Sequence, residues 1–242
     1  MTETIDDEIG AQQGALPAYI QIAELISRQI SAGHLIDGQR LPTEREMAKS
    51  YNVAVGTLRK SLARLTELGL LERRQGSGNY ITKNENSATI YSFFRLELPD
   101  GGGLPTAQLL SLSTVPKPDD LPLFGSADFA HRFRRLRLLD NQPVALEEIW
   151  LDGSAAPDIN KAQLSQSIYQ FYKDHLNLWI SRAEDWVSLA TVPAWGGQSF
   201  PLASGTMAGF VERFGWSQTN EKVEYSRTWY NPETARYVAR IK

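Results

Sequence analysis

The sequence predicts an α+β protein in two parts, a small helical part that ends in a hairpin and a larger part built on an antiparallel sheet. Two patterns carry this prediction. Apolar residues recur every three or four positions up to Leu65, as on amphipathic helices, and they alternate with polar residues over much of 89–231, as on strands. The polar run at 83–87 separates the two patterns, and 242 residues are enough for two hydrophobic cores.

Two helices are expected at the start of the first part. Pro17 stands at a first helical position, and the helix that it opens ends at Gly33. The apolar face of this helix is formed by Ile22, Leu25, Ile26 and Ile30. Thr43 and Glu46 have the spacing of a capping box, in which each satisfies a backbone amide of the other. They predict a second, short helix that ends around Asn52.

A third helix and a hairpin complete the first part. The third helix has one apolar stripe, made of Leu58, Leu62 and Leu65. Two short strands at 70–74 and 79–82 surround the glycine-rich tip Gln75-Gly76-Ser77-Gly78. Three helices followed by such a hairpin are the arrangement of a winged helix-turn-helix domain, which we expect to span 16–83.

The second part, 89–242, is expected to follow a linker at 84–88 and to contain seven strands and one helix. The strands alternate in hydropathy and cover 89–98, 107–115, 129–139, 144–151, 179–192, 205–215 and 222–231. The helix begins near Ser167 and continues to about Leu176. This mixture is typical of an α+β domain with an antiparallel sheet.

The net charge of −3 is unevenly distributed along the chain. Residues 1–16 have a net charge of −4, residues 17–83 one of +4, and residues 84–242 one of −3. Because DNA is a polyanion, the winged segment is the part suited to bind it. The acidic residues 1–15 are expected to form a disordered tail, and shielding of the basic face is an alternative role for them.

Three segments of the first part match a known pattern: Leu41 to Ala48, Thr57-Leu58-Arg59 with Leu62 and Leu65, and Gly69 to Gly78. With them, this part closely resembles the DNA-binding domain of the GntR family of bacterial transcriptional regulators. In that family the arginines at the positions of Arg45 and Arg59 and the wing glycine at the position of Gly76 contact DNA. The resemblance implies the same roles here.

The residues themselves also favour a DNA interface. A recognition helix needs a small residue at its entry, cations for phosphates and a planar fork for a guanine edge. The candidate DNA contacts are Thr43, Arg45, Gly56, Thr57, Arg59, Lys60, Arg64, Arg74, Gly76 and Ser77. Arg73 and Lys83 add positive charge for phosphates. For single residues such as Arg64 or Arg74, a solvated helix or strand face is the alternative.

One position departs from the GntR pattern. Ala54-Val55 stands where the family has a Ser-Arg pair at the start of the recognition helix. The difference removes a helix cap worth about 1 kcal/mol and a residue suited to read guanine. The operator sequence therefore does not follow from the resemblance.

The second part has its own matching segments: Arg135 to Asp140, Pro143 to Glu148, Ser167-Ile168-Tyr169 and Val223 to Arg227. They resemble the effector domain of the HutC subfamily, called UTRA, which has a chorismate-lyase-like fold. In members that sense phosphorylated amino sugars, the anion is held at the positions equivalent to Arg135, Arg137, Ser167 and Tyr169, with a serine near Ser92. The resemblance further implies that the polar body of an effector faces Glu147, Glu224 and Tyr230.

Local chemistry makes such a pocket plausible. Arg135 and Arg137 project from one face of a strand, as a cationic pair would for an anion. Ser167 and Gln170 fit a capping box, whose free amides attract anions, but a plain cap is the alternative. Glu147 has an apolar setting and needs a partner, either a ligand or an arginine of the chain. One strand face, either pocket wall or solvated surface, carries Glu224, Ser226, Thr228 and Tyr230.

Several classes of protein are disfavoured by the composition. The chain has no cysteine, and its three histidines lack metal-ligand spacing, so no metal and no cofactor are expected. No segment has the pattern of a membrane span or a signal peptide, which favours a cytoplasmic protein without a membrane partner. No nucleophile and base stand in a recognisable pattern, so we expect that the protein is not an enzyme.

These observations together predict a homodimeric transcriptional regulator, a repressor in the first instance. Its partners would be a pseudo-palindromic double-stranded DNA operator and a small anionic metabolite, such as a sugar phosphate, an organic acid or a phosphonate. Two alternatives stay open. The second domain could be a lyase-like enzyme fused to a DNA-binding domain, or it could bind no ligand and serve in dimerisation.

Overall fold

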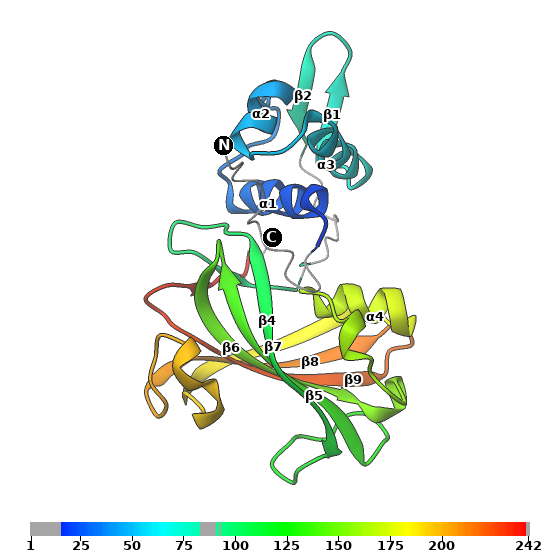
Figure 1. Cartoon of the computed structure of the whole chain (residues 1–242), viewed down its shortest axis with the longest axis vertical. Helices are drawn as coiled ribbons and strands as arrows, with labels where there is room; N and C mark the ends of the chain where they lie inside the picture. Colours follow the sequence, from blue (N-terminus) through cyan, green and yellow to red (C-terminus); the bar gives the residue numbers. More distant parts are fainter. Residues whose placement is uncertain (1–15, 83–90, 92, 241–242) are drawn as a thin grey trace, which may run out of the picture.

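The computed structural model describes residues 16–82, 91 and 93–240. In this part of the chain, the first unit consists of helices α1 (Ala18–Ala32), α2 (Glu44–Ser50) and α3 (Val55–Glu67), followed by the hairpin of β1 (Leu71–Arg74) and β2 (Gly78–Ile81) (Figure 1). These are the elements that the sequence predicts. The expected acidic tail, the linker at 84–88 and Lys83 lie outside the described residues.

Local signals set the ends of these helices. Pro17 is the N-cap of α1, one position before the first helical residue, and Gly33 ends the helix in the left-handed conformation. The predicted capping box of α2 is present, since Thr43 accepts from the N–H of Glu46, and the Glu46 carboxylate accepts from the N–H of Thr43 at 2.8 Å. α3 begins after Ala54 without a side-chain cap.

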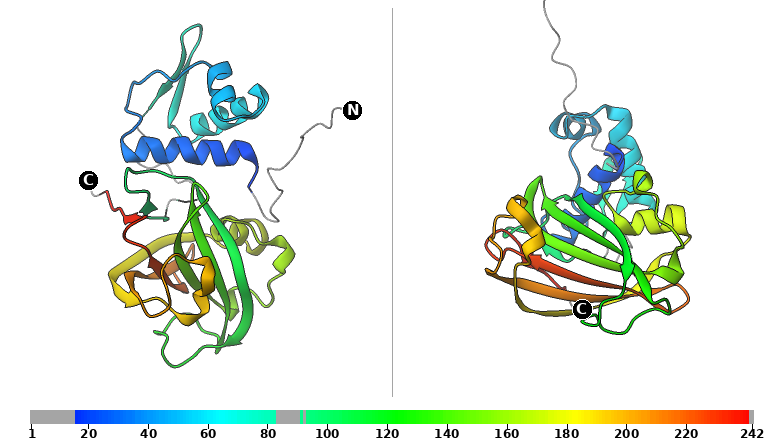
Figure 2. Two further views of the ribbon diagram at one scale, coloured as in Figure 1. Left: turned by 60° about the vertical axis from the view of Figure 1, so that its left-hand side comes forward. Right: turned by 60° about the horizontal axis from the view of Figure 1, so that its bottom comes forward.

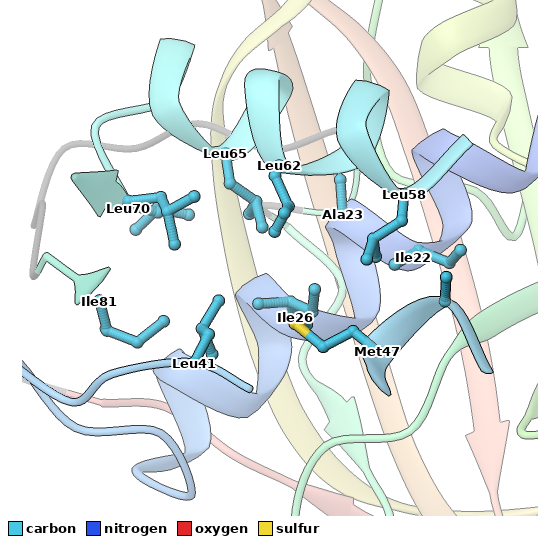
Figure 3. Packing of buried hydrophobic residues seen from close by; sticks show 12 residues of the cluster. Ile22, Ala23, Ile26, Leu41, Met47, Leu58, Leu62, Leu65, Leu70 and Ile81 are labelled. Atoms are coloured by element: carbon cyan, nitrogen blue, oxygen red, sulfur yellow. The ribbon is translucent and has the colours of Figure 1, made fainter. Parts of the chain in front are cut away.

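The apolar faces of the three helices meet in one core (Figure 3). Ile26 of α1 and Leu58 and Leu65 of α3 are fully buried, Met47 adds a side chain from α2, and Ile81 closes the core from the hairpin. Burial of one such side chain contributes about 1.5–3 kcal/mol. The core therefore holds α3 and the hairpin, or wing, in a fixed relative position.

The second unit is built on a six-stranded antiparallel sheet with the order β4-β5-β6-β9-β8-β7. The strands are β4 (Pro105–Pro116), β5 (Phe129–Leu139), β6 (Gln142–Asp152), β7 (Ile180–Thr191), β8 (Met207–Ser217) and β9 (Lys222–Tyr230). Helix α4 (Ile168–Leu176) covers one sheet face, where it packs against Phe133 of β5 and Ile149 of β6. The short 3-10 turn η3 (Ala194–Ser199) covers part of the other face, where Trp195 contacts Trp229.

One predicted strand is wrong. Of the described residues between 89 and 98, only Leu96–Glu97 forms a strand, β3, which pairs with β10 (Arg236–Tyr237) outside the main sheet. Residues 89, 90 and 92 lie outside the described residues. The carbonyl oxygens of Phe94 and Leu96 accept hydrogen bonds from the side chain of Arg28. The apolar side chains of Phe93, Phe94 and Leu96 pack against the sheet unit, so alternating hydropathy here reflects burial without pairing to the main sheet.

The two units are stacked along the long axis of the molecule. α1 lies between the rest of its own unit and the sheet unit, while the wing points away from the sheet (Figures 1 and 2). Arg28 extends from α1 into the sheet unit and is buried there. None of the described helices is long and apolar enough to span a membrane.

Candidate functional site

A concave surface lies between the starts of α2 and α3 and the wing. It is lined by residues 40–46, Val55, Arg59 and 73–79. The structure thus gathers the predicted contacts Thr43, Arg45, Arg59, Arg74, Gly76 and Ser77 from segments up to thirty-four residues apart. The other four predicted contacts, Gly56, Thr57, Lys60 and Arg64, lie on α3 outside this lining.

Glu44 pairs with two arginines of this surface. Its carboxylate accepts a hydrogen bond of 2.7 Å from Nε of Arg59 and lies 3.7 Å from the guanidinium of Arg73. The side chain of Arg59 is 64% exposed, so the ion pair is screened by water and worth on the order of 0.2–1 kcal/mol. A phosphate or a guanine edge can therefore replace Glu44 at low cost.

The wing presents an open tip above braced side chains. Gly76 has φ of 72°, a conformation that favours glycine, and nothing lies within 4 Å of the position that a Cβ would take. Below the tip, the Arg74 guanidinium lies over the Tyr80 ring at 4.3 Å, and the Tyr80 hydroxyl is 2.7 Å from Oγ of Ser77. The backbone of the tip is free to approach a duplex, and its neighbours are held in place.

A second site is a cavity of about 60 Å³ in the sheet unit, several times the roughly 10–15 Å³ that one water needs. It lies between the sheet, the start of α4, Tyr91 and the residues from Phe93 to Leu96. Six predicted effector residues line it: Arg135, Arg137, Glu147, Ser167, Tyr169 and Glu224. The predicted Ser92 lies outside the described residues.

Glu147 is paired within the protein. It accepts a hydrogen bond of 2.9 Å from Nε of Arg135 and lies 3.7 Å from Nη1 of Arg137. Burial alone would raise the pKa of Glu147, but the charges of Arg135 and Arg137 outweigh burial and hold this pKa below its usual range. The sequence left open whether Glu147 pairs with a ligand or with an arginine of the chain. The structure has the internal ion pair, in which Nε and Nη2 of Arg135 both donate to Glu147.

Arg137 has spare hydrogen-bonding capacity. Its side chain is 3% exposed, yet Nε and Nη2 have no hydrogen-bond partner among the described residues. Burial lowers the pKa of Arg137 to about 10, so the group stays charged at neutral pH. Because an unpaired buried donor costs about 1–3 kcal/mol, an anion that reached Arg137 would be stabilised.

Glu224 offers an acceptor on the same sheet face. Its Oε1 accepts a hydrogen bond of 2.8 Å from the Tyr169 hydroxyl, and its Oε2 has no partner among the described residues. Burial raises the pKa of Glu224, although the Tyr169 hydrogen bond acts against this. Ser167 caps α4, since its Oγ accepts a hydrogen bond from the N–H of Gln170.

The Gln170 side chain donates to Asp174 instead of returning to the backbone of Ser167. Only one half of the predicted capping box is therefore present.

Comparison with known proteins decides between the classes of protein that these sites allow. The profile described as "Bacterial regulatory proteins, gntR family" matches residues 18–81, and the profile described as "UTRA domain" matches residues 100–236. The chain is a member of the GntR family with a UTRA domain. Proteins of this family are DNA-binding transcriptional regulators and not enzymes.

Two relatives support this membership, and one solved structure has the same fold. The chain is 50% identical to the HTH-type transcriptional regulator SmoD of Agrobacterium fabrum, over 95% of this chain and 98% of that protein. It is 31% identical to the mannosyl-D-glycerate transport/metabolism system repressor MngR of Escherichia coli, over 71% of this chain and 73% of the relative. The crystal structure of YydK from Bacillus subtilis has the same fold, with a TM-score of 0.53 at 20% identity, covering 94% of this chain and 100% of that one.

Sequence reasoning missed several residues of this GntR-family regulator. Arg213 of β8 lines the cavity of the sheet unit and forms a bidentate ion pair with Asp185 of β7. Burial opposes the charge of Arg213 and is the largest single influence on its pKa, but Asp185 and Tyr169 together outweigh burial and raise this pKa. The signal was present, because Arg213 interrupts the apolar run around Val211 and Phe214. Glu44 and Arg40 on the first site were missed as well.

Tyr230, a predicted effector contact, does not line this cavity. It shares the strand face of Glu224, but it packs with Leu96, Val144 and other residues of a separate apolar cluster. A Cβ on Gly209 would lie 2.2 Å from the Tyr230 ring, so this glycine makes room for the ring.

Among the described residues, no group of acidic residues and histidines is placed to hold a metal ion.

Proposed function

We propose that this regulator represses transcription by binding a pseudo-palindromic operator as a homodimer, with α3 in the major groove and the wing on the adjacent backbone. The observation that carries this proposal is the convergence of Arg45, Arg59, Arg74 and the Gly76 tip around one concave surface, at the end of the molecule away from the sheet unit (Figure 1). Two of the relatives, NagR of Bacillus subtilis and MngR, are named as repressors, which supports the sign of the regulation.

In this proposal the contacts divide by chemistry. Arg59 presents a planar fork to a guanine edge, while Arg45 and Arg74 neutralise phosphates. Ser77 and the Gly76 backbone donate to the phosphates next to them, while Thr43 lines the same surface and caps α2. Further along α3, Gly56 and Thr57 allow a close approach, and Lys60 and Arg64 meet the flanking backbone.

Selection of binding sites from fragmented genomic DNA tests the DNA part of the proposal. At about 0.15 M salt, nonspecific phosphate contacts are weak enough to lose the competition. We expect enrichment of a pseudo-palindrome with half-sites about one helical turn apart or a multiple of it. Recovery of random fragments, in the presence and absence of candidate effectors, would contradict sequence-specific binding.

We further propose that the UTRA pocket binds a small metabolite with one anionic group and a hydroxylated body. The unpaired N–H groups of the buried Arg137 support the anion, with Ser167 and the amides at the start of α4 beside it. The unpartnered oxygen of Glu224 and the Tyr169 hydroxyl suit the hydroxyl groups of a sugar. The name of MngR refers to mannosyl-D-glycerate, a glycoside that carries a carboxylate, and this chemistry matches the pocket.

A panel of sugar phosphates, sugar acids, other organic acids and phosphonates tests the effector part. A ligand that prefers the folded protein raises its melting temperature in proportion to the logarithm of its concentration. We expect a rise with at least one hydroxylated anion and none with its uncharged analogue. A melting temperature that no member changes would favour the alternative in which the sheet unit serves in dimerisation.

The proposed homodimer would use the edge strand β7. This strand ends the sheet, and Trp186, Val187 and Leu189 on it are 58%, 51% and 70% exposed. An unprotected edge with large apolar side chains is a liability in a monomer. A second copy of this chain, related by a twofold axis, would cover this edge, because each of the two copies then presents its own β7 to the other.

A further inference from the structure

Arg28 occupies a seat in the sheet unit that is made of backbone carbonyl groups. Its Nε donates to the carbonyl oxygen of Gly103 at 2.7 Å, and Nη2 donates to that of Leu96. Nη1 lies 3.4 Å from the carbonyl oxygen of Phe94, and the whole side chain is 7% exposed. Because Arg28 belongs to α1, the DNA-binding unit is tied to the sheet unit by one buried cation.

The seat shares an aromatic ring with the effector pocket. The guanidinium of Arg28 lies 5.4 Å from the centroid of the Phe94 ring, and the guanidinium of Arg137 lies 4.3 Å from the same centroid. Phe94 itself lines the pocket. The two positive charges act on each other, which is one cause of the lowered pKa of Arg137. Burial lowers the pKa of Arg28 itself, so its seat is already costly for a cation.

We propose that Arg28 couples the pocket to the position of the DNA-binding unit, through the Phe94 ring that it shares with Arg137. The proposal rests on the proposed function of the pocket as an anion site. An anion on Arg137 offsets the positive charge that lies on the same Phe94 ring as Arg28, and it attracts Arg28 as well. Occupancy of the pocket therefore stabilises α1 in its seat, and, by reciprocity, seating of Arg28 strengthens anion binding.

The predicted stabilisation of α1 by an occupied pocket distinguishes a coupling role of Arg28 from a purely structural one. A structural contact would hold α1 equally well with an empty and an occupied pocket. A coupling residue changes its contribution with the charge on Arg137. The coupling also has a short range in the structure, since the segment from Phe94 to Gly103 carries the carbonyl groups that hold Arg28, and Phe94 also lines the pocket.

The first experiment measures the arrangement of the two units in the full chain. The sequence has no cysteine, so Gln75→Cys on the wing and Leu123→Cys on the sheet unit, both exposed, provide two spin-label sites. Labelled chain is diluted into unlabelled chain, and inorganic sulfate is added at constant ionic strength against chloride. We expect sulfate to narrow the distribution of distances between the two spin labels around the distance of the arrangement in which Arg28 is seated.

Variants of Arg28 separate charge from packing. Arg28→Gln should lose the narrowing by sulfate and should bind sulfate about fivefold or more weakly in calorimetry. Arg28→Lys keeps the charge and should keep part of both effects. Lys173→Gln, at an exposed cation on α4, is the control and should behave as the wild type. Wild-type sulfate affinity and a full sulfate response in Arg28→Gln would overturn the proposal.

A double-mutant cycle tests the same link without any anion. Arg137→Gln removes the opposing charge, so it should favour the seated arrangement in the wild-type background and have no effect in Arg28→Gln. Additive effects would overturn the coupling. If Arg137→Gln does not fold, Phe94→Leu replaces it and should reduce the sulfate response while both charges remain. Absence of sulfate binding to the wild type would count against the proposed anion site, and the cycle would still decide the role of Arg28.

Discussion

The hydroxyl of Tyr169 donates a hydrogen bond of 2.8 Å to Oε1 of Glu224, between α4 and the opposite strand β9. The second oxygen of Glu224 has no partner among the described residues. Burial therefore raises the pKa of Glu224 and favours its protonated form in the folded protein. Glu224 therefore makes the stability of the folded protein depend on pH.

Glu224→Gln should stabilise the protein at neutral pH. A raised pKa contributes stability that is present below the ordinary glutamate value of about 4.3 and is lost as the pH rises through the raised value. Glutamine imitates the protonated group, so the melting temperature of the variant should exceed that of the wild type at pH 7 and equal it near pH 4. Glu147→Gln is the matched control with the opposite sign, because the pKa of Glu147 is lowered, and it should destabilise most at pH 7.

Arg59→Ala should weaken specific operator binding by about 1–3 kcal/mol. The guanidinium that now pairs with Glu44 would be missing from the recognition surface. Arg59→Lys keeps the charge without the planar fork and should keep nonspecific binding while it loses discrimination. Fluorescence anisotropy with operator and scrambled duplexes measures both. Unchanged operator affinity in Arg59→Ala would remove this residue from the readout.

Ala54→Ser should stabilise the DNA-binding unit by about 1 kcal/mol. Ala54 has the extended backbone of an N-cap, φ −64° and ψ 146°, but no side chain that can accept a hydrogen bond from the first turn of α3. Urea unfolding at equilibrium gives the free-energy difference. Ala63→Ser, at an exposed position inside α3, controls for the serine itself and should not stabilise.

Arg137→Met should abolish the response to an anionic effector while operator binding is retained. The substitution removes the buried guanidinium with unpaired N–H groups and leaves Glu147 paired with Arg135. Arg135→Met, in contrast, leaves the buried Glu147 without its principal partner and should lower the melting temperature sharply. Equal effector affinity in Arg137→Met and the wild type would place the anion elsewhere.

Leu189→Asp should dissociate the proposed homodimer. The substitution puts a charge in the middle of the exposed apolar edge of β7, where a second strand would pack. Sedimentation equilibrium reports the mass. Leu123→Asp, at a 94% exposed position in a loop, is the control and should leave the assembly unchanged. A dimer that survives Leu189→Asp would exclude this edge as the interface.

Most of the fold could be predicted because its signals are local. The capping box of Thr43 and Glu46, the turn at Gly33 and the stripe of Leu58 are set by residues within one or two helical turns. Six of the seven predicted strands are present in the sheet for the same reason, since alternation along a strand records which face is buried. The strand predicted over 89–98 was wrong because apolar side chains such as Phe94 and Leu96 are buried against the sheet unit without pairing to the main sheet.

Part of the pocket could be predicted, and part could not. Arg135 and Arg137 follow from strand parity, and Ser167 from its place at the start of a helix. The parity that places Glu224 on the pocket face also includes Tyr230, and only packing with Leu96 and Val144 shows that Tyr230 lies in another cluster. Parity gives the face of a sheet, but the lining of a cavity depends on what covers that face.

The sequence by itself determined the winged helix-turn-helix, the antiparallel sheet and the basic first part, because caps, periodicity and charge are properties of neighbours in the chain. Tertiary structure decided that Glu147 pairs with Arg135, that Arg213 joins the pocket, and that Arg28 is seated beside Phe94. These contacts join residues that are 12 to 75 positions apart. Their energies depend on burial and on charges that meet only after both units have folded.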